Sequence, residues 1–177
     1  WAGLKFDYTS LYSFSKELKE SNTKDTARDI FNQTIKKQDK QPYEFYFINK
    51  TSFSGLTESS CYAPQAFDQN FTLSCIEKLK PVSDLLQSVE ITNFDYNELL
   101  ERDGQDVFIY LDPPYYIKTN LYGKKGVHHK NFDHNLFYQN ISKCKHKWMI
   151  SYNDCDFVRS TYSNYRIETW EHKYIMQ

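Results

Sequence analysis

The sequence predicts a mixed α/β fold in which a parallel sheet follows a helical front half. Two apolar runs, at residues 107–111 and 148–150, are typical of buried strands. Asp133 lies between them and can cap a helix that runs to about residue 143. A strand, a helix and a second strand in this order are typical of a parallel sheet. The 177 residues, 40% of them hydrophobic, suit one compact domain or one domain with a modest insertion.

Residues 1–88 are predicted to be mostly helical, with one loop or hairpin. Helical spacing of apolar residues, or a proline that can start a helix, marks three segments at residues 10–39, 42–48 and 69–88. The run 43–48 is too short for its periodicity to separate a helix from a strand. Residues 51–68 are rich in Ser, Thr, Gly and Pro, which indicates the loop or hairpin. Pro81 is expected to interrupt the last helix.

Residues 89–177 are predicted to form the α/β part. The run 107–111 is continuously apolar, with β-branched and aromatic members, as in a parallel strand buried on both faces. Further short elements are expected: strands at 89–92, 165–170 and 173–176, and helices at 97–101 and 157–161. Because α/β sheets bind ligands at the carboxyl ends of their strands, we expect chemistry just past the run 107–111.

The charge of the chain is close to balanced. A formal net charge of −1 argues against a protein that coats nucleic acid non-specifically. Two clusters of basic residues fit either a local groove for DNA or a solvated face: Lys118, Lys124, Lys125, His128, His129 and Lys130, and Lys143, Lys145 and Lys147. The aromatic share of 18% fits either packing or stacking surfaces for nucleobases.

The four cysteines form no C-x-x-C pair, so the sequence predicts neither a zinc ribbon nor a thioredoxin-like motif. No apolar signal segment opens the sequence, and no apolar run is long enough to span a membrane. We therefore expect a cytoplasmic protein with reduced thiols.

The loop Asp112-Pro113-Pro114-Tyr115 follows the first apolar run and carries the groups needed to hold an amine. An ionised Asp112 only accepts hydrogen bonds. The two prolines lack a backbone N–H and fix φ, so carbonyl acceptors are held in place. With the flat ring of Tyr115, these acceptors fit a planar group with an exocyclic amine. The amine would donate a hydrogen bond from each of its two hydrogens to them, and its nitrogen would become nucleophilic. The alternative is a proline-rich turn that caps a strand, with Tyr115 packed on it.

Five segments, in order, resemble the D12 class of DNA adenine-N6 methyltransferases, which includes the Dam-type enzymes. They are residues 49–56, 59–71, 89–96, 107–115 and 147–152. The resemblance implies a Rossmann-like class I methyltransferase sheet with a helical target-recognition insertion. Residues 1–88 would be the recognition region and residues 89–177 the catalytic half. The implied reaction moves a methyl group from S-adenosylmethionine to adenine N6 in double-stranded DNA, as in restriction-modification systems.

The resemblance also implies roles for single residues. Four are catalytic: Asp112, Pro113, Pro114 and Tyr115. Asp112 and the Pro113 carbonyl would hold the target amine, while Tyr115 stacks on an adenine flipped out of the duplex. The cofactor is bound by Phe94, Asp95 and Asp112, where Asp95 contacts the adenine amine of the cofactor and Phe94 lies beside its ring. A second role for Asp95 is the N-cap of the following helix.

Contacts with DNA are implied for Asn49, Lys50, Phe53 and Ser54. Lys50 would contact phosphate, and Phe53 would wedge into the base stack. The alternative for Phe53 is ordinary packing within a hairpin. Lys50 and Ser54 stand where the family has Arg and Asn. Lysine does not replace a bidentate arginine, so no recognition sequence is assigned.

The Phe-x-Gly-x-Gly turn that follows the family's first strand is missing, since none of the five glycines forms G-x-G. The sequence resembles a member without its first strand and helix, so the sheet is expected to be incomplete at its N-terminal side. We expect the glycine-rich cofactor loop to come from a missing N-terminal segment or a second chain. This chain alone is then expected to bind the cofactor weakly and to methylate nothing.

Three alternatives stay open. The chain could be an inactive DNA-binding or partner-binding remnant of such an enzyme. It could be a metal hydrolase built on His128, His129, Asp133 and His134, although these residues form no H-E-x-x-H helix and we expect no metal. It could methylate another group, because Asn in place of Asp112 is associated with guanine-N2 or glutamine substrates, and Ser with cytosine-N4. Asp112 favours adenine.

Overall fold

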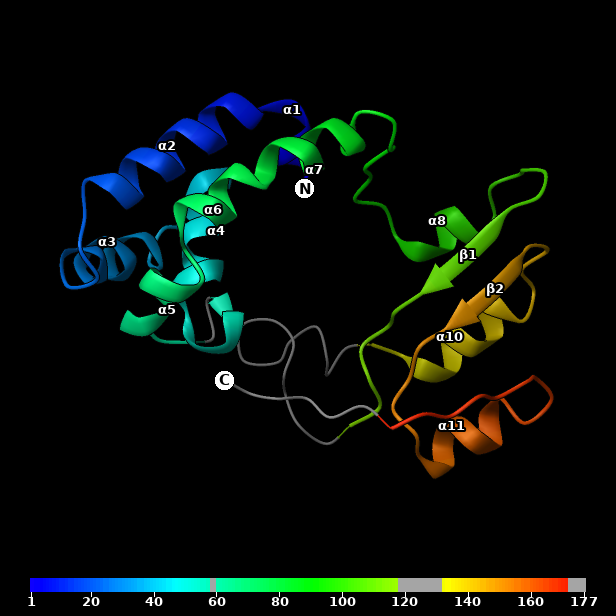
Figure 1. Cartoon of the computed structure of the whole chain (residues 1–177). Helices are drawn as coiled ribbons and strands as arrows, with labels where there is room; N and C mark the ends of the chain where they lie inside the picture. The colour runs from blue at the N-terminus through cyan, green and yellow to red at the C-terminus, as the bar shows by residue number, and fades with distance from the viewer. Residues whose placement is uncertain (58–59, 118–131, 172–177) are drawn as a thin grey trace. The chain divides into compact units, whose positions relative to one another are not determined.

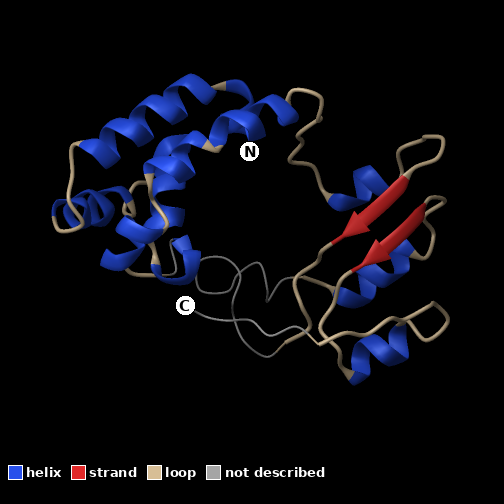
Figure 2. Cartoon of the chain, in the orientation of Figure 1, coloured by secondary structure: helices blue, strands red, loops and turns tan. Residues whose placement is uncertain are grey.

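Two units make up the chain, each with a hydrophobic core of its own. The structure, a computed structural model, describes residues 1–57, 60–117 and 132–171. The boundary between the units lies between Thr92 and Asn93. The first unit is helical, and the second contains the strands (Figures 1 and 2). The predicted division after residue 88 assigned target recognition to the first part and catalysis to the second, and these two roles stay a prediction.

The helical unit consists of short helices that begin at residues suited to a helix start. They are α1 (Ala2–Phe6), α2 (Tyr8–Glu20), α3 (Thr26–Thr34), α4 (Pro42–Thr51), the 3-10 turn η1 (Phe53–Gly55), α5 (Pro64–Gln69), α6 (Leu73–Glu77) and α7 (Leu79–Leu86). Pro42 and Pro64 each occupy the first turn of their helix, where no backbone N–H is needed. Thr72 caps α6 by accepting the N–H of Cys75 at 3.1 Å. The run 43–48 is therefore helical.

Two predicted helices have different limits in the structure. The segment 10–39 contains both α2 and α3, because the polar residues between them bond to their own helix ends. The amide of Asn22 donates to the Leu18 carbonyl at 3.0 Å and stops α2 there. The segment 69–88 is interrupted at Lys78 and not at Pro81. Pro81 is the third residue of α7, a position whose N–H has no partner within a helix.

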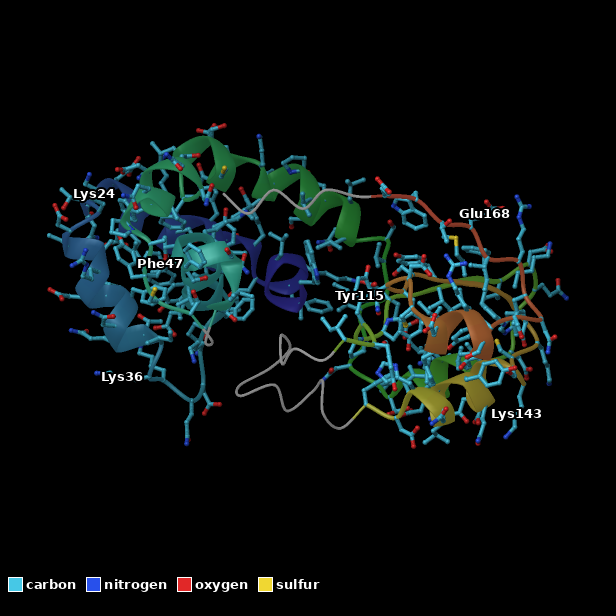
Figure 3. The ribbon with its side chains drawn as sticks, turned by 90° about the horizontal axis from the view of Figure 1, so that it is seen from below. Lys24, Lys36, Phe47, Tyr115, Lys143 and Glu168 are labelled. Carbon is cyan, nitrogen blue, oxygen red and sulfur yellow. The ribbon has the colours of Figure 1, made fainter. Side chains whose placement is uncertain are left out.

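Phenylalanine rings fill the core of the helical unit. Phe47 of α4 lies in the middle of this unit (Figure 3) and is 1% exposed. Its ring centroid is 5.3 Å from that of Phe71 and 6.4 Å from that of Phe31, both nearly edge to face, the favoured geometry for aromatic pairs. In the middle of α7, the Ser83 hydroxyl donates to the Leu4 carbonyl at 2.9 Å and ties α7 to α1.

The second unit contains the predicted parallel sheet, which has two strands within the described residues. Its elements are α8 (Tyr96–Leu100), β1 (Phe108–Leu111), α10 (His134–Ile141), β2 (Lys147–Ile150) and α11 (Asp156–Thr161). The register places Phe108 opposite Lys147 and Leu111 opposite Ile150. The predicted cap of α10 is confirmed, because the Asp133 carboxylate accepts the N–H groups of Asn135 and Leu136 at 3.0 and 2.9 Å.

Only one face of this sheet is covered within the described residues. Ile109 and Leu111 of β1 pack, with Trp148 and Ile150, against a core supplied by α8, α10 and α11: Leu100, Phe137, Ile141, Val158 and Tyr162. The other face is open, with Phe108 60% exposed and Tyr110 57% exposed. The prediction of a strand buried on both faces is therefore wrong for the described chain, because these helices all pack on one side.

Two predicted strands are absent. Residues 89–92 have no regular structure, because the Val89 N–H closes a turn on the Leu86 carbonyl at 3.1 Å. Residues 165–170 do not pair with a strand in the described chain, and the Tyr165 N–H bonds the nearby Tyr162 carbonyl at 2.9 Å. The strand expected at 173–176 lies outside the described residues.

Two further observations concern membrane spans and cysteines. In the part that the structure describes, every helix is too short or too polar to cross a membrane. All four cysteines are free thiols.

A buried carboxylate at the start of α4 generates the first prediction. Glu44 is 7% exposed, and its side chain accepts Lys37 Nζ at 2.5 Å and the Gln41 N–H at 2.9 Å. Burial acts to raise the pKa of Glu44, but the hydrogen bonds from Lys37 and Gln41 and the charges of Lys37 and Lys40 outweigh it, so the pKa is lowered. The ionised form is thus stabilised by folding.

We expect Glu44→Gln to reduce the free energy of unfolding by about 1 kcal/mol at neutral pH. Because the native pKa is lowered, this contribution is present above the ordinary glutamate pKa and is lost as pH falls through the native pKa. Urea unfolding of both proteins across pH 3–7 should show a difference that shrinks in acid, whereas Glu77→Gln, at an exposed helix end, should show none. A difference that is constant with pH would contradict the assignment.

Candidate functional site

The carboxyl ends of β1 and β2 lie side by side and bring two polar side chains together. The Ser151 N–H donates to the Leu111 carbonyl at 3.0 Å, which extends the parallel pairing one residue beyond β2. The Ser151 hydroxyl then donates to Asp112 Oδ1 at 2.5 Å. Asp112, whose carboxylate is the predicted acceptor for the target amine, is exposed at this edge.

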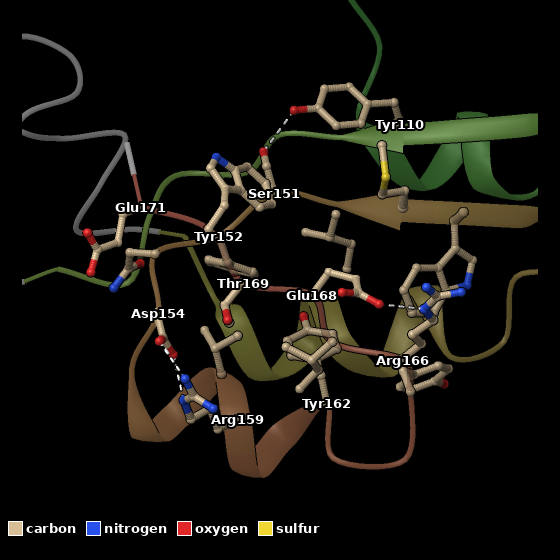
Figure 4. Close-up of a pocket in the computed structure, with 18 of the residues that line it drawn as sticks. Tyr110, Ser151, Tyr152, Asp154, Arg159, Tyr162, Arg166, Glu168, Thr169 and Glu171 are labelled. Atoms are coloured by element: carbon tan, nitrogen blue, oxygen red, sulfur yellow. Dashed lines mark hydrogen bonds and ion pairs between the residues drawn. The ribbon is translucent and has the colours of Figure 1, made fainter. Parts of the chain in front are cut away.

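A third side chain extends this contact. The Tyr110 hydroxyl donates to Ser151 Oγ at 3.0 Å (Figure 4). Tyr110 and Asp112 are two residues apart on one strand, so both point to the open face of the sheet. The sequence placed residues 147–152 near the site only by resemblance, and it did not identify Ser151 or Tyr110 as partners of Asp112.

The rest of the predicted loop is anchored by the chain that follows β2. Pro113 is buried, while Pro114 and Tyr115 are half-buried. The next residue, Tyr116, stacks on Phe157 with ring centroids 4.2 Å apart and planes 11° apart. The amide of Asn153 donates to the Tyr116 carbonyl at 2.9 Å. Tyr116 was not predicted as a site residue, and no sequence spacing links it to Phe157.

His134 closes this anchor on its other side. Its ring meets Tyr116 edge-on at 5.1 Å, and its Nδ1 is 2.5 Å from the Tyr152 hydroxyl. Burial, followed by the neighbouring Tyr162, Cys155 and Tyr96, raises the pKa of Tyr152 well above its ordinary value. The Tyr152 hydroxyl therefore stays neutral over the working pH range, and its contact with His134 is a hydrogen bond.

The described residues do not support the alternative of a metal hydrolase. Asp133 is engaged as the cap of α10 and His134 contacts Tyr152. Across residues 1–57, 60–117 and 132–171, no three His, Cys, Asp or Glu side chains are grouped to hold a metal ion. His128 and His129 lie outside those ranges, as does the whole of the first basic cluster.

A cavity of about 1080 Å³ lies beside β2 within the second unit (Figure 4). Aromatic side chains form much of its wall, among them Trp148, Tyr162, Tyr165 and Trp170. Tyr110 and Ser151 also line it, whereas residues 112–115 do not. The cavity is thus lined by the two side chains that hold Asp112, and residues of the predicted loop do not line it.

The residues expected to bind the cofactor precede α8. Asp95 is the N-cap of this helix, because its Oδ1 accepts the Asn97 N–H at 3.0 Å. Its side chain is nevertheless exposed, as is half of the Phe94 ring. The guanidinium of Arg102 lies 5.3 Å from the centroid of that ring. An exposed acceptor beside an exposed ring fits a planar aminopurine, and the capping role occupies one carboxylate oxygen.

The residues expected to contact DNA surround η1 in the helical unit. A single antiparallel bridge joins Ser52 to Tyr62, and the Phe53 N–H donates to the Cys61 carbonyl at 2.9 Å. Phe53 is 53% exposed on this turn, and its predicted wedging into DNA and its packing within a hairpin both stay predictions. The amide of Asn49 donates to the Gly55 carbonyl at 3.2 Å and fixes the turn from α4.

Backbone strain is concentrated in the same turn. Ser54 and Thr57 have φ of 53° and 48°, a left-handed conformation that costs non-glycine residues energy. Gly55, at φ 67°, adopts it without that cost. Lys50 Nζ lies 5.8 Å from the Tyr46 ring centroid. Strained backbone positions of this kind cluster at active sites and ligand clamps.

Similarity to known proteins indicates the family of the chain. The family model described as "D12 class N6 adenine-specific DNA methyltransferase" matches residues 5–176. The chain is also similar to the type II methyltransferase M.MjaIII of Methanocaldococcus jannaschii, with 30% identity over 156 residues. This match covers 80% of the chain and 54% of the relative, so the chain spans about half the length of that protein.

The stack of Tyr116 on Phe157 generates the second prediction. We expect Tyr116→Ala to speed amide hydrogen exchange at residues 115–117 by about fivefold, since an aromatic pair contributes about 1 kcal/mol. Tyr116→Phe keeps the ring and should exchange as the parent does. The control is Tyr165→Ala, which removes a ring packed on Trp148 elsewhere in the same unit. Equal exchange in Tyr116→Ala and the parent would show that the stack does not hold the loop.

Proposed function

Because the chain belongs to the D12 class of N6 adenine-specific DNA methyltransferases, we propose that it carries the target-amine site of an enzyme that methylates adenine N6 in double-stranded DNA. The methyl donor would be S-adenosylmethionine, and the enzyme would be the modification partner of a restriction system. The observation that carries the proposal is the exposed Asp112 carboxylate at the end of β1, followed by two prolines and Tyr115.

The chemistry of the proposed site rests on acceptors. Asp112 and the Pro113 carbonyl would accept hydrogen bonds from the two hydrogens of the target amine, and Tyr115 would stack on the flipped base. An amine held by two acceptors has its lone pair turned away from them, so the nitrogen can attack without a covalent enzyme intermediate. Positioning and electrostatics would supply most of the rate. Aspartate at position 112 favours adenine as the target.

Phe94 and Asp95 are the residues proposed to hold the cofactor. Their exposed ring and carboxylate suit the adenine base of S-adenosylmethionine, with Asp95 accepting from its amine and Phe94 lying beside its plane. When bound, S-adenosylmethionine supplies an electrophilic methyl group. Asp95 would serve this purpose while it caps α8.

We further propose that β1 and β2 belong to a larger Rossmann-like sheet, and that residues 1–88 are the target-recognition region. The open sheet face, with Phe108 and Tyr110 more than half exposed, supports an additional layer. No G-x-G turn occurs in the sequence, so the glycine-rich cofactor loop would come from another segment or a second chain. Asn49, Lys50, Phe53 and Ser54 would then contact DNA.

The third prediction tests the amine site. In the protein encoded by the complete open reading frame, we expect Asp112→Asn and Tyr115→Ala each to lower methyl transfer about 100-fold or more, as removal of a transition-state contact does. Transfer of labelled methyl groups from S-adenosylmethionine to DNA measures it. Asp103→Asn, at an exposed loop position of the same unit, should keep activity.

Two results of that assay would count against the proposal. Full activity in Asp112→Asn would mean that this carboxylate does not hold the amine. DNA binding without methyl transfer, in the complete protein, would favour an inactive DNA-binding remnant. The chain of 177 residues, assayed beside it, is expected to transfer little.

The fourth prediction tests the DNA contact. We expect Phe53→Ala to reduce base flipping, seen as a smaller rise in the fluorescence of 2-aminopurine at the target position. Phe45 of α4 is an apt control, because it is 52% exposed and Phe53 is 53% exposed. Phe45→Ala should leave the signal unchanged. Equal signals from the two variants would assign Phe53 to the surface and not to the DNA interface.

A further inference from the structure

We propose that Ser151 is a positioning residue that fixes the carboxylate of Asp112, and that Tyr110 in turn fixes the Ser151 hydroxyl. The proposal rests on the proposed function for its catalytic consequence. Its structural part concerns three side chains that share the open face of the sheet: Tyr110, Asp112 and Ser151.

The carboxylate of Asp112 needs such a partner. The prolines that follow it fix the backbone but leave its side-chain torsions free. The χ1 torsion of an aspartate has three staggered wells and its terminal torsion is broad, so an exposed carboxylate samples several rotamers unless a donor holds it. Ser151 supplies that donor at 2.5 Å, a length typical of a hydroxyl bonded to an ionised carboxylate.

The direction of each hydrogen bond follows from the donors available. An ionised carboxylate only accepts, so the single hydroxyl hydrogen of Ser151 points to Asp112 Oδ1. Ser151 Oγ can then only accept from Tyr110, at 3.0 Å. Hydrogen bonds chained in one direction polarise and strengthen one another. The consequence is an exposed Asp112 held through Oδ1, with no hydrogen bond to Oδ2 within the described residues.

Sheet pairing explains why this serine is in the right place. Leu111 lies opposite Ile150, so the next residues along the two strands, Asp112 and Ser151, are neighbours on the same face. The Ser151 N–H is bonded to the Leu111 carbonyl at 3.0 Å, independently of its hydroxyl. Removal of the hydroxyl therefore leaves the pairing intact, and Ser151→Ala should fold.

The fifth prediction compares Ser151→Ala, Ser151→Thr and Tyr110→Phe in the complete protein. We expect Ser151→Ala to lower kcat about 10- to 100-fold, the effect of one hydrogen bond to a charged group, with KM for DNA and the urea midpoint unchanged. Ser151→Thr keeps the hydroxyl and should recover most of kcat. Tyr110→Phe should have a smaller effect of the same kind. Ser160→Ala, which removes an exposed hydroxyl from α11, is the matched control.

A second measurement does not depend on activity. The Hα–Hβ couplings of Asp112, measured by NMR, should report a single rotamer in the parent and in Ser151→Thr, and averaged rotamers in Ser151→Ala. Averaged couplings in the parent, or a single rotamer in Ser151→Ala, would overturn the proposal. A rotamer that depends on Ser151 in a protein without methyl transfer would keep the positioning and reject the proposed function.

Discussion

The parallel pairing of β1 with β2 is the interaction on which the candidate site depends. Its register sets which side chains of two segments, distant in sequence, share a face. Ile109 and Leu111 turn toward the helices, and the alternate residues Tyr110 and Asp112 turn away. One further hydrogen bond, from the Ser151 N–H to the Leu111 carbonyl, carries the register past the end of β2. A slip of one residue would move Ser151 to the opposite face and leave Asp112 without its donor.

The same register separates stability from chemistry. The apolar side chains that hold the second unit together lie between the sheet and α8, α10 and α11. The polar chain of Tyr110, Ser151 and Asp112 lies on the other face, where it disturbs no apolar packing. The loop after Asp112 is then fixed by contacts outside the sheet, through the Tyr116 ring and carbonyl. Backbone and side chain of the site are thus held by different groups.

Sequence patterns predicted the parts of the fold that local physics decides. Both strands and the Asp133 cap are confirmed. The run after Pro42 fits a helix or a strand by sequence, and the structure has the helix α4 there. The strand expected at 89–92 is absent, because a turn at the end of α7 satisfies that backbone first. The position of Asp112 past a strand could be predicted, but its bond to Ser151 could not. That bond joins residues 39 apart in sequence and depends on strand register.

The aromatic residues illustrate why composition alone left two readings open. Phe31, Phe47, Phe67 and Phe71 are each no more than 1% exposed, and they account for the core of the helical unit. Phe53 and Phe94 are about half exposed, each beside a group that could bind a ligand: a strained turn for Phe53 and the Asp95 carboxylate for Phe94. Packing thus explains the first set and leaves the second without a structural role of comparable strength. Burial of an aromatic ring stabilises a fold, so packing explains the four buried rings, whereas Phe53 and Phe94 forgo about half of that gain and leave ring surface accessible to a ligand.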